Sequence, residues 1–300
     1  MTASRGGTLF VVATPIGNLG DITLRALETL RSVPLIAAED TRVTRRLLTR
    51  YEIPTRTTSY HARSGPVREE ELLTHLRGGA DLALVTDAGT PAVSDPGEGL
   101  VSRWAGEGGP VVPIPGASSV LAAVAASGIA GPRWAFEGFL PRSGRERRER
   151  LARIAADERG SVVFEAPGRT AATLCDLAAA CGGGRVGAVC RELTKLHETI
   201  TRDTLASLAE AAADGAIPAR GEVVIVVGWA AASGDRGAAT AGAVEVARAE
   251  VERLVASGIA RGEAAKRVAR EHGIPRRQLY GNPATERREG SATRTVARRP

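Results

Sequence analysis

The sequence predicts an α/β protein with two α/β domains and a small helical module at its C-terminus. Three observations support this. Short apolar runs alternate with helical patterns over residues 9–114, a second series of this kind follows Gly116, and a stretch of small residues then precedes several short helical segments. Strands that alternate with helices are typical of a mainly parallel sheet covered by helices. A chain of 300 residues, 43% of them hydrophobic, is large enough to bury two cores.

The first predicted domain spans residues 1–116. Asp21 is a candidate N-cap for a helix with Leu24, Leu27 and Leu30 on one face, and Thr41 is a candidate cap for a basic helix that continues to residue 51. A further helix is expected at residues 100–105. The compact apolar runs that predict the strands are residues 9–13, 35–38, 82–85 and 111–114.

The second predicted domain spans residues 117–229. It begins with an Ala-rich helix, capped by Ser118 or Ser119, that continues to Ala126. More antiparallel pairing is expected here than in the first domain. The predicted strands are residues 135–137, 162–164, 186–189 and 223–227, and the predicted helices are residues 145–157, 170–180 and 205–213.

The C-terminal part of the chain has a different composition. Residues 230–243, AAASGDRGAATAGA, are predicted to be a linker of small residues. Residues 244–282 contain three short helical segments, interrupted at 257–258 and 273–275, and resemble a helix-turn-helix module. Residues 283–300 have almost no large apolar side chain and are predicted to be a disordered basic tail.

The net charge of +6 is concentrated near the C-terminus. Residues 261–300 carry eleven basic and four acidic side chains, which leaves 29 of the 40 basic and 30 of the 34 acidic residues for the rest of the chain. Basic clusters attract phosphate backbones, so an anionic polymer is a plausible partner. The segments 141–153 and 261–299 suit phosphate contacts, although segment 141–153 has the alternative of an exposed helix with internal ion pairs.

Several other classes of protein are disfavoured. No run of eighteen apolar residues and no signal peptide is present, so we expect a cytoplasmic protein with no membrane partner. The three cysteines, Cys175, Cys181 and Cys190, have neither the number for a disulfide framework nor the spacing of a zinc site, and no metal is expected. No G-x-x-x-x-G-K-[ST] motif occurs.

Polar residues follow several predicted strands, where ligands bind in open α/β sheets. Residues 86–97, TDAGTPAVSDPG, form a turn-rich loop with small hydroxyl groups that suits a pocket built largely from backbone. Residues 39–42, EDTR, follow another strand, where a helix cap is the alternative to a cleft. A third polar cluster, RELTKLHE at 191–198, is either a site or a solvated edge with ion pairs.

Ser118 is also a candidate nucleophile of a hydrolase. The segment IPGASSV, residues 114–120, contains the first half of a G-x-S-x-G motif but has Val120 in place of the second glycine. The four histidines are scattered along the chain, which leaves this serine without an evident base. Capping of a helix is the better interpretation.

Six segments in this order resemble one known family: ATPIGNLGDITLRALETLRSV, LIAAEDTR, VTDAGTPAVSDPG, VPIPGASS, FEGFLP and RELTKLHE. They resemble the ribosomal RNA 2'-O-methyltransferases of the tetrapyrrole-methylase superfamily, over residues 8–228. The resemblance implies two domains of the class III methyltransferase type, a homodimer, and S-adenosylmethionine in the cleft between the domains. It also implies a cytidine of small-subunit ribosomal RNA as the methyl acceptor, either in free RNA or in the assembled subunit.

The resemblance also implies a set of cofactor-binding residues. The cofactor loop of the family, G-[DT]-P-x-x-[YS], falls on residues 89–94. The residues implied to line the cofactor pocket are Pro15, Asp87, Ala88, Gly89, Thr90, Val93, Ser94, Ser118, Ser119 and Ala166.

Methyl transfer to a ribose hydroxyl needs alignment of the reacting groups, and a base or a cation would assist it. Glu39 or Asp40 is the hypothetical proton acceptor, and Arg42 or Lys195 is the hypothetical source of positive charge. Two other functions stay open. A tetrapyrrole C-methyltransferase would share the fold and the cofactor, and a non-enzymatic nucleic-acid-binding protein would account for residues 244–300 alone.

Overall fold

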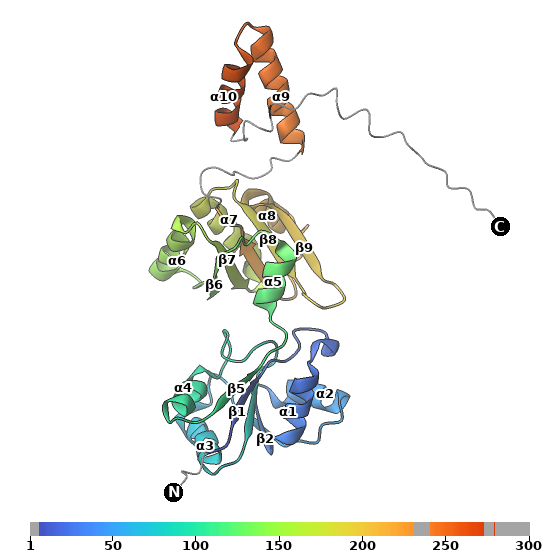
Figure 1. Ribbon diagram of the computed structural model, residues 1–300, viewed down its shortest axis with the longest axis vertical. Coiled ribbons are helices and arrows are strands. Elements are labelled where there is room, and N and C mark those ends of the chain that lie inside the picture. Colours follow the sequence, from blue (N-terminus) through green and yellow to red (C-terminus); the bar gives the residue numbers. More distant parts are fainter. Residues whose placement is uncertain (1–5, 231–240, 273–278, 280–300) are drawn as a thin grey trace, which may run out of the picture. The chain divides into compact units, whose positions relative to one another are not determined.

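The computed structural model describes residues 6–230, 241–272 and 279 (Figure 1). The chain divides into two compact units, Met1–Ala230 and Ala231–Pro300. The first unit contains two five-stranded sheets, one from each half of its sequence. None of the described helices is both long and apolar enough to cross a membrane.

The first sheet is entirely parallel, with the strand order β3-β2-β4-β1-β5. Because its strands are parallel, the loops that follow them meet at one edge. The strands are β1 (Leu9–Val12), β2 (Leu35–Ala38), β3 (Thr57–Ser59), β4 (Leu82–Val85) and β5 (Val111–Ile114). The helices are α1 (Leu24–Ser32), α2 (Thr41–Arg50), α3 (Gly65–Arg77) and α4 (Glu98–Gly106), with a short 3-10 turn η1 (Leu19–Asp21).

Both faces of this sheet are buried. One apolar cluster joins the sheet to α1 and α2 through residues such as Leu30, Ile36 and Leu48. The other joins it to α3 and α4 through residues such as Leu73 and Trp104. The strand β4, LALV, is buried along its whole length, as expected for a central strand of a doubly covered sheet.

The second sheet is mixed, with the order β6-β7-β10-β8-β9, and only β6 and β7 pair in parallel. One face packs against α5, and the other face packs against α6, α7 and α8. The strands are β6 (Trp134–Phe139), β7 (Gly160–Glu165), β8 (Val186–Arg191), β9 (Thr199–Thr204) and β10 (Val223–Val227). The helices are α5 (Ser119–Ser127), α6 (Gly144–Ala156), α7 (Thr170–Cys181) and α8 (Leu205–Ala213), with a 3-10 turn η2 (Pro167–Arg169).

The second unit contains α9 (Ala241–Ala256) and α10 (Arg261–His272). Val251, Ala264, Val268 and Leu279 belong to its small apolar core. The predicted linker is wrong at its C-terminal end, because α9 already begins at Ala241. The remainder of that linker, most of the third predicted helical segment and the predicted tail at 283–300 lie outside the described residues.

Most predicted elements are confirmed within two or three residues, but two predicted caps are wrong. Thr23 caps α1 in place of Asp21, and the first residue of that helix, Leu24, is 79% exposed. Asp40 caps α2 in place of Thr41, because the Asp40 carboxylate accepts a hydrogen bond from the Arg42 N–H. Ser118 is the cap of α5. The elements β3, α3 and β9 were not predicted.

Candidate active site

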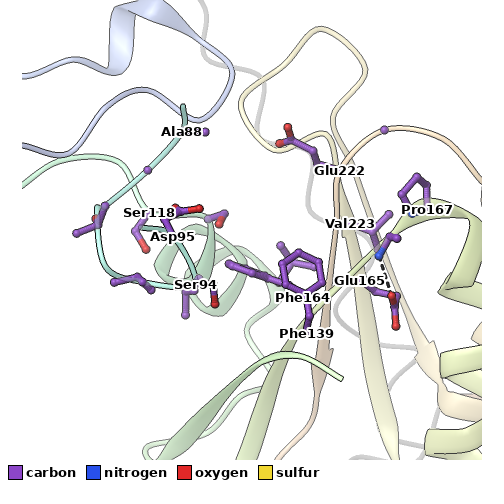
Figure 2. A pocket seen from close by; sticks show the side chains of 18 residues that line it. Ala88, Ser94, Asp95, Ser118, Phe139, Phe164, Glu165, Pro167, Glu222 and Val223 are labelled. Carbon is purple, nitrogen blue, oxygen red and sulfur yellow. Dashed lines mark hydrogen bonds between the residues drawn. The ribbon is translucent and has the colours of Figure 1, made fainter. Parts of the chain in front are cut away.

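A pocket of about 420 Å³ is lined by loops of the first sheet and by strand ends of the second (Figure 2). One wall consists of the loop after β4 and the start of α5, and the opposite wall includes Phe139 and Phe164. Pockets of roughly 300–1,000 Å³ are typical of sites for small molecules. The lining residues are Ala88, Gly89, Thr90, Val93, Ser94, Asp95, Ser118, Ser119, Val120, Phe139, Phe164, Glu165, Ala166, Pro167, Gly221, Glu222, Val223 and Val224.

The loop after β4 has an unusual backbone. Gly89 has a φ of +82° and exchanges two backbone hydrogen bonds with Thr14, at 2.8 and 3.0 Å, which tie the loop to the end of β1. Ala92 and Ser94 also have positive φ, at +67° and +65°. Left-handed backbone at residues other than glycine costs about 1–3 kcal/mol each and is concentrated at functional sites. This loop therefore combines strain with a position in a pocket wall.

We expect Gly89→Ala to lower the free energy of unfolding by about 1–2 kcal/mol, because a Cβ disfavours left-handed backbone. The effect would come from the backbone alone, since the new Cβ would lie 3.5 Å from its nearest neighbour, the Ile16 Cγ2 atom. Gly106→Ala is the matched control. Gly106 lies in α4 with ordinary backbone and open space around it, so alanine there should be neutral or stabilising. Urea denaturation measures both, and equal stability of the two variants would contradict the expectation.

The wall contributed by the second sheet is largely apolar. Phe139 and Phe164 pack edge to face with ring centroids 5.5 Å apart, and both lie at the C-terminal ends of their strands. Gly221 lacks the space for a side chain, because an added Cβ would lie 2.6 Å from the Glu192 side chain. Phe139, Phe164 and Glu222 were not predicted as site residues. The aromatic residues at the ends of two neighbouring strands could have indicated this wall.

The charged residues in the pocket wall are all acidic: Asp95, Glu165 and Glu222. The Glu165 side chain is fully buried, and its oxygens accept hydrogen bonds from the Ala166 N–H at 2.8 Å and the Thr173 hydroxyl at 2.6 Å. Glu165 is also paired with Arg169 at 3.3 Å, and Glu222 is paired with Lys195 at 3.2 Å. Asp95 is therefore the wall carboxylate that has no ion pair with a described residue.

Most of the predicted cofactor-binding residues line this pocket together. Two do not: Pro15 is buried beside the backbone bridge between Thr14 and Gly89, and the Asp87 carboxylate accepts a hydrogen bond from the Asp40 N–H at 2.9 Å. The predicted residues found in the pocket wall are Ala88, Gly89, Thr90, Val93, Ser94, Ser118, Ser119 and Ala166.

The four residues predicted to be catalytic lie outside the pocket wall. Asp40 is a helix cap and forms a bidentate pair with the Arg42 guanidinium, at 3.0 and 2.6 Å. The hydrogen bonds from Arg42 lower the pKa of Asp40 to about 2, which makes this carboxylate a weak base at neutral pH. For residues 39–42 a helix cap was the alternative to a cleft. In the structure Asp40 is such a cap, and Arg42 is paired with it.

Glu39 joins the ends of β2 and β4. Its carboxylate accepts a hydrogen bond from the Asp87 N–H at 3.3 Å, and burial raises its pKa. The Asp87 carboxylate in turn accepts a hydrogen bond from the Asp40 N–H. These two hydrogen bonds connect the residues that follow β2 with the residue Asp87 that follows β4. This arrangement supports the loop that follows Asp87.

Lys195 does not line the pocket, but it is paired with a residue that does. Its ammonium group pairs with Glu192 at 2.9 Å and with Glu222 at 3.2 Å, and Glu222 lines the pocket. Its alkyl chain packs against Gly17, where an added Cβ would lie 2.4 Å from the Lys195 Cγ. Burial lowers the pKa of Lys195, but its acidic partners outweigh this, so the pKa is raised and the amine stays charged.

Asp95 is not among the site residues predicted from the sequence. It lies between the candidate cofactor pocket and a second pocket of about 420 Å³, and it lines both of them. Burial, together with the nearby Glu39 and Asp87 carboxylates, raises the pKa of Asp95 to about 6. No hydrogen bond or ion pair from the described part of the chain involves its carboxylate.

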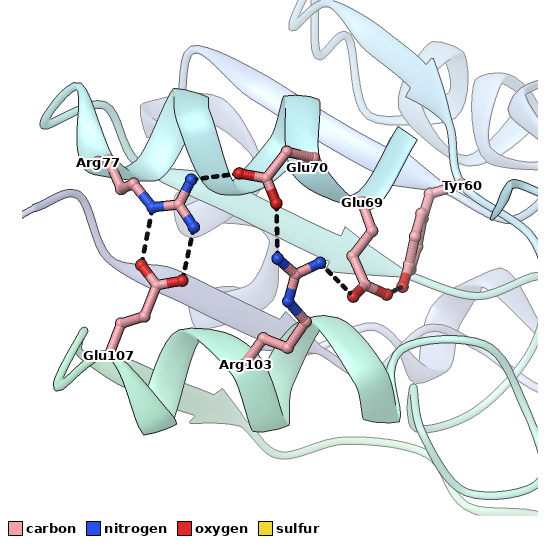
Figure 3. Close-up of polar contacts among 6 residues, drawn as sticks. All are labelled: Tyr60, Glu69, Glu70, Arg77, Arg103 and Glu107. Atoms are coloured by element: carbon pink, nitrogen blue, oxygen red, sulfur yellow. Dashed lines mark hydrogen bonds and ion pairs between the residues drawn. The ribbon is translucent and has the colours of Figure 1, made fainter. Parts of the chain in front are cut away.

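The second pocket has a polar lining that includes His61, Ser64 and Glu69. An ion-pair network between α3 and α4 supports it (Figure 3). The Tyr60 hydroxyl donates to Glu69 at 2.8 Å, and burial together with this bond raises the pKa of Tyr60. The pairs that extend the network along the two helices are Arg103 with Glu69 and Glu70, and Arg77 with Glu70 and Glu107.

No cluster of His, Cys, Asp and Glu that could hold a metal ion occurs in the described part of the chain. The three cysteines are free, and burial raises the pKa of Cys190 to about 11, which keeps it a poor nucleophile.

Comparison with known proteins gives one consistent family. The sequence family described as Tetrapyrrole (Corrin/Porphyrin) Methylases matches residues 8–209. A Synechocystis protein named Ribosomal RNA small subunit methyltransferase I is 44% identical over 274 residues, or 91% of this chain and 96% of that protein. A protein of the same name from Pseudomonas aeruginosa is 44% identical over 230 residues, or 76% of this chain and 82% of that protein.

Solved structures share the fold at lower sequence identity. A cobalt precorrin-4 methyltransferase of cobalamin biosynthesis aligns with a TM-score of 0.58 at 21% identity, covering 74% of this chain and 95% of that chain. The uroporphyrin-III C-methyltransferase of Thermus thermophilus, in complex with S-adenosylhomocysteine, aligns with a TM-score of 0.54 at 21% identity, covering 74% and 97%.

Proposed function

Because the chain belongs to the tetrapyrrole (corrin/porphyrin) methylase family, we propose that it is an S-adenosylmethionine-dependent methyltransferase whose acceptor is small-subunit ribosomal RNA. The methylated atom is the ribose 2'-oxygen of a cytidine. The pocket around the strained loop after β4 is the observation that carries this proposal, and the names of relatives that match over nine tenths of the chain support the acceptor.

The residues around the pocket fit S-adenosylmethionine. Phe139 and Phe164 offer an apolar surface for a flat base, and Ser94 and Ser118 offer hydroxyl groups for polar ends. Asp95, the wall carboxylate without an ion-pair partner among the described residues, favours a ligand with a cationic centre. When bound, the cofactor supplies a methyl group activated by its attachment to a positively charged sulfur.

The task left to the chain is to hold the acceptor in place and to remove its proton. Loop 88–95 is fastened to β1 through Thr14 and Gly89, which limits motion of the pocket wall. The polar second pocket, which shares Asp95 with the first, provides space for the acceptor nucleotide. Rigid walls on both sides favour a fixed orientation of the reacting groups.

Asp95 is the proposed proton acceptor. It is the residue that lines both pockets among those described, and its pKa of about 6 leaves it mostly ionised at neutral pH but more basic than an ordinary aspartate. Glu39, whose pKa is also raised, is the second candidate, and its bond to the Asp87 N–H makes it less available. Lys195 stabilises Glu222 in the wall.

Transfer of a labelled methyl group tests the proposal. The purified chain is incubated with methyl-labelled S-adenosylmethionine and, separately, with small ribosomal subunits, naked small-subunit RNA and a tetrapyrrole precursor. We expect label in a 2'-O-methylcytidine of the RNA. Label in the tetrapyrrole alone would replace this function by the C-methylation chemistry named for the structural neighbours, and RNA binding without transfer would favour a non-enzymatic protein.

A homodimer and a cytoplasmic location remain part of the proposal. The homodimer is supported by the resemblance to the family, and the cytoplasmic location by the ribosomal RNA substrate named for the relatives. Whether the acceptor is free RNA or the assembled subunit is answered by the two RNA substrates of the same experiment.

A further inference from the structure

One face of α2 carries four exposed arginines. Arg42, Arg45, Arg46 and Arg50, called here the α2 arginine face, are separated by steps of three, one and four residues, which brings them to one side of the helix. On the opposite side Leu48 is buried in the apolar cluster between the sheet and α1, and Leu47 is also buried. Together with Leu19, Thr41 and Thr49 the arginines line an open groove of about 800 Å³.

The charge of this face is largely uncompensated. The helix has no acidic residue, and Arg42 alone is paired, with the Asp40 carboxylate at its N-terminus. The Arg50 guanidinium lies over the Tyr51 ring at 5.7 Å. Neither Arg45 nor Arg46 forms an ion pair or hydrogen bond with any residue that the structure describes. Like charges at the i,i+4 spacing destabilise a helix.

The other basic helix of the first unit, α6, is different. Arg145 pairs with Glu149, Arg147 with Asp176, and Arg150 with Glu137, so the charges of these arginines are compensated within the chain. Its unpaired arginines, Arg148 and Arg153, are five residues apart and lie on different sides of the helix. The expectation that segment 141–153 suits phosphate contacts is therefore weakened, and its alternative of internal ion pairs is favoured.

We propose that the α2 arginine face binds the phosphate backbone of the RNA substrate; this inference rests on the function proposed above. Guanidinium groups match phosphate oxygens in charge and geometry. Residues 42–50 span about 12 Å along the helix axis, which is long enough to lie against more than one phosphate of an RNA strand. An RNA strand neutralises the mutual repulsion that the arginines otherwise retain.

The location of the face also suits this role. α2 begins directly after Asp40. The Asp40 N–H donates a hydrogen bond to the carboxylate of Asp87, the residue that precedes the pocket loop. The arginine face and the candidate active site thus begin at the same edge of the sheet. RNA held along α2 is positioned by contacts that carry no sequence information, as is typical of phosphate contacts.

The test is the double variant Arg45→Gln with Arg46→Gln, in the full chain. Glutamine keeps the helix propensity of arginine, so α2 should persist. We expect affinity for small-subunit RNA to fall about tenfold in 0.1 M salt, and the slope of log affinity against log salt to fall by one to two units. Affinity for S-adenosylmethionine, measured by calorimetry, should stay at the level of the unsubstituted protein, which also shows that the variant is folded.

The matched variant is Arg148→Gln with Arg153→Gln, which removes the same charge from exposed positions of α6. We expect it to weaken RNA binding by less than about twofold. An equal loss in both double variants, or unchanged affinity and salt slope in the α2 variant, would overturn the inference while the proposed function stands. If the unsubstituted protein neither binds nor methylates small-subunit RNA, the proposed function fails and this inference fails with it.

Discussion

Replacing Asp95 by asparagine is expected to reduce the rate of methyl transfer to RNA at least about 100-fold. A positioned general base contributes about 10²–10⁴-fold to rate, and an amide of the same shape cannot accept the proton. Asp95 lines both pockets and has no partner among the described residues that must first be displaced. Single-turnover rates with saturating cofactor measure the effect, and calorimetry should show S-adenosylmethionine bound within a few-fold of its original affinity.

The pH dependence of the reaction provides an independent check. Burial raises the pKa of Asp95 to about 6, and the base must be ionised to act, so the rate should rise with pH through that value. About one tenth of the groups are ionised at pH 5 and about nine tenths at pH 7. An aspartate with its ordinary pKa would give a flat profile above pH 5. We expect the residual rate of the Asp95→Asn variant to lack the inflection near pH 6.

Asp40→Asn tests the competing assignment. Asparagine caps helices as well as aspartate does, so α2 should stay intact, and the lost carboxylate has a pKa of about 2. We expect this variant to keep most of the activity. Loss of activity in Asp40→Asn, together with near-normal rates in Asp95→Asn, would return the role of base to Asp40.

The sheet core was predictable because its strands are short runs of residues buried on both faces. Strands β2 and β4 coincide with the predicted runs, and their residues are almost all buried. Strand β9, TITRDT, is mostly exposed at an edge and has a polar sequence, so no apolar run revealed it. Helix α3 begins with Gly65 and a proline and buries leucines only in its second half, which obscured its periodicity.

Part of the candidate site could likewise be predicted from the sequence, and part of it could not. The loop of residues 88–95 was predictable because its Gly and Pro residues indicate an unusual backbone from the local sequence alone. Phe164 and Glu222 come from the second sheet, and their meeting with that loop depends on tertiary packing. Asp95 has no local signal that separates it from Asp87, because burial, the main cause of its raised pKa, arises only in the folded chain.

The largest expected effect on stability is at Arg147, a buried arginine of α6. Its guanidinium donates to the Asp176 carboxylate at 2.8 Å, to the Pro141 carbonyl at 2.9 Å and to the Thr173 hydroxyl at 3.0 Å. Thr173 in turn donates to Glu165 at 2.6 Å, so the chain of bonds ends at a wall of the candidate cofactor pocket.

We expect Arg147→Met to lower the free energy of unfolding by about 3 kcal/mol. Methionine fills much of the volume but satisfies none of the three acceptors, and breaking a buried charged network costs about 3–5 kcal/mol. The partial exposure of Asp176 places the estimate at the lower end. Arg148→Met is the control, because Arg148 is exposed on the same helix and its replacement should change stability by less than about 0.5 kcal/mol. Urea denaturation of both variants measures the difference, and similar losses in the free energy of unfolding would mean that the network adds little.

Because the network ends at Glu165 in the pocket wall, we also expect weaker cofactor binding in Arg147→Met than in Arg148→Met. The difference should persist at temperatures where both proteins are fully folded.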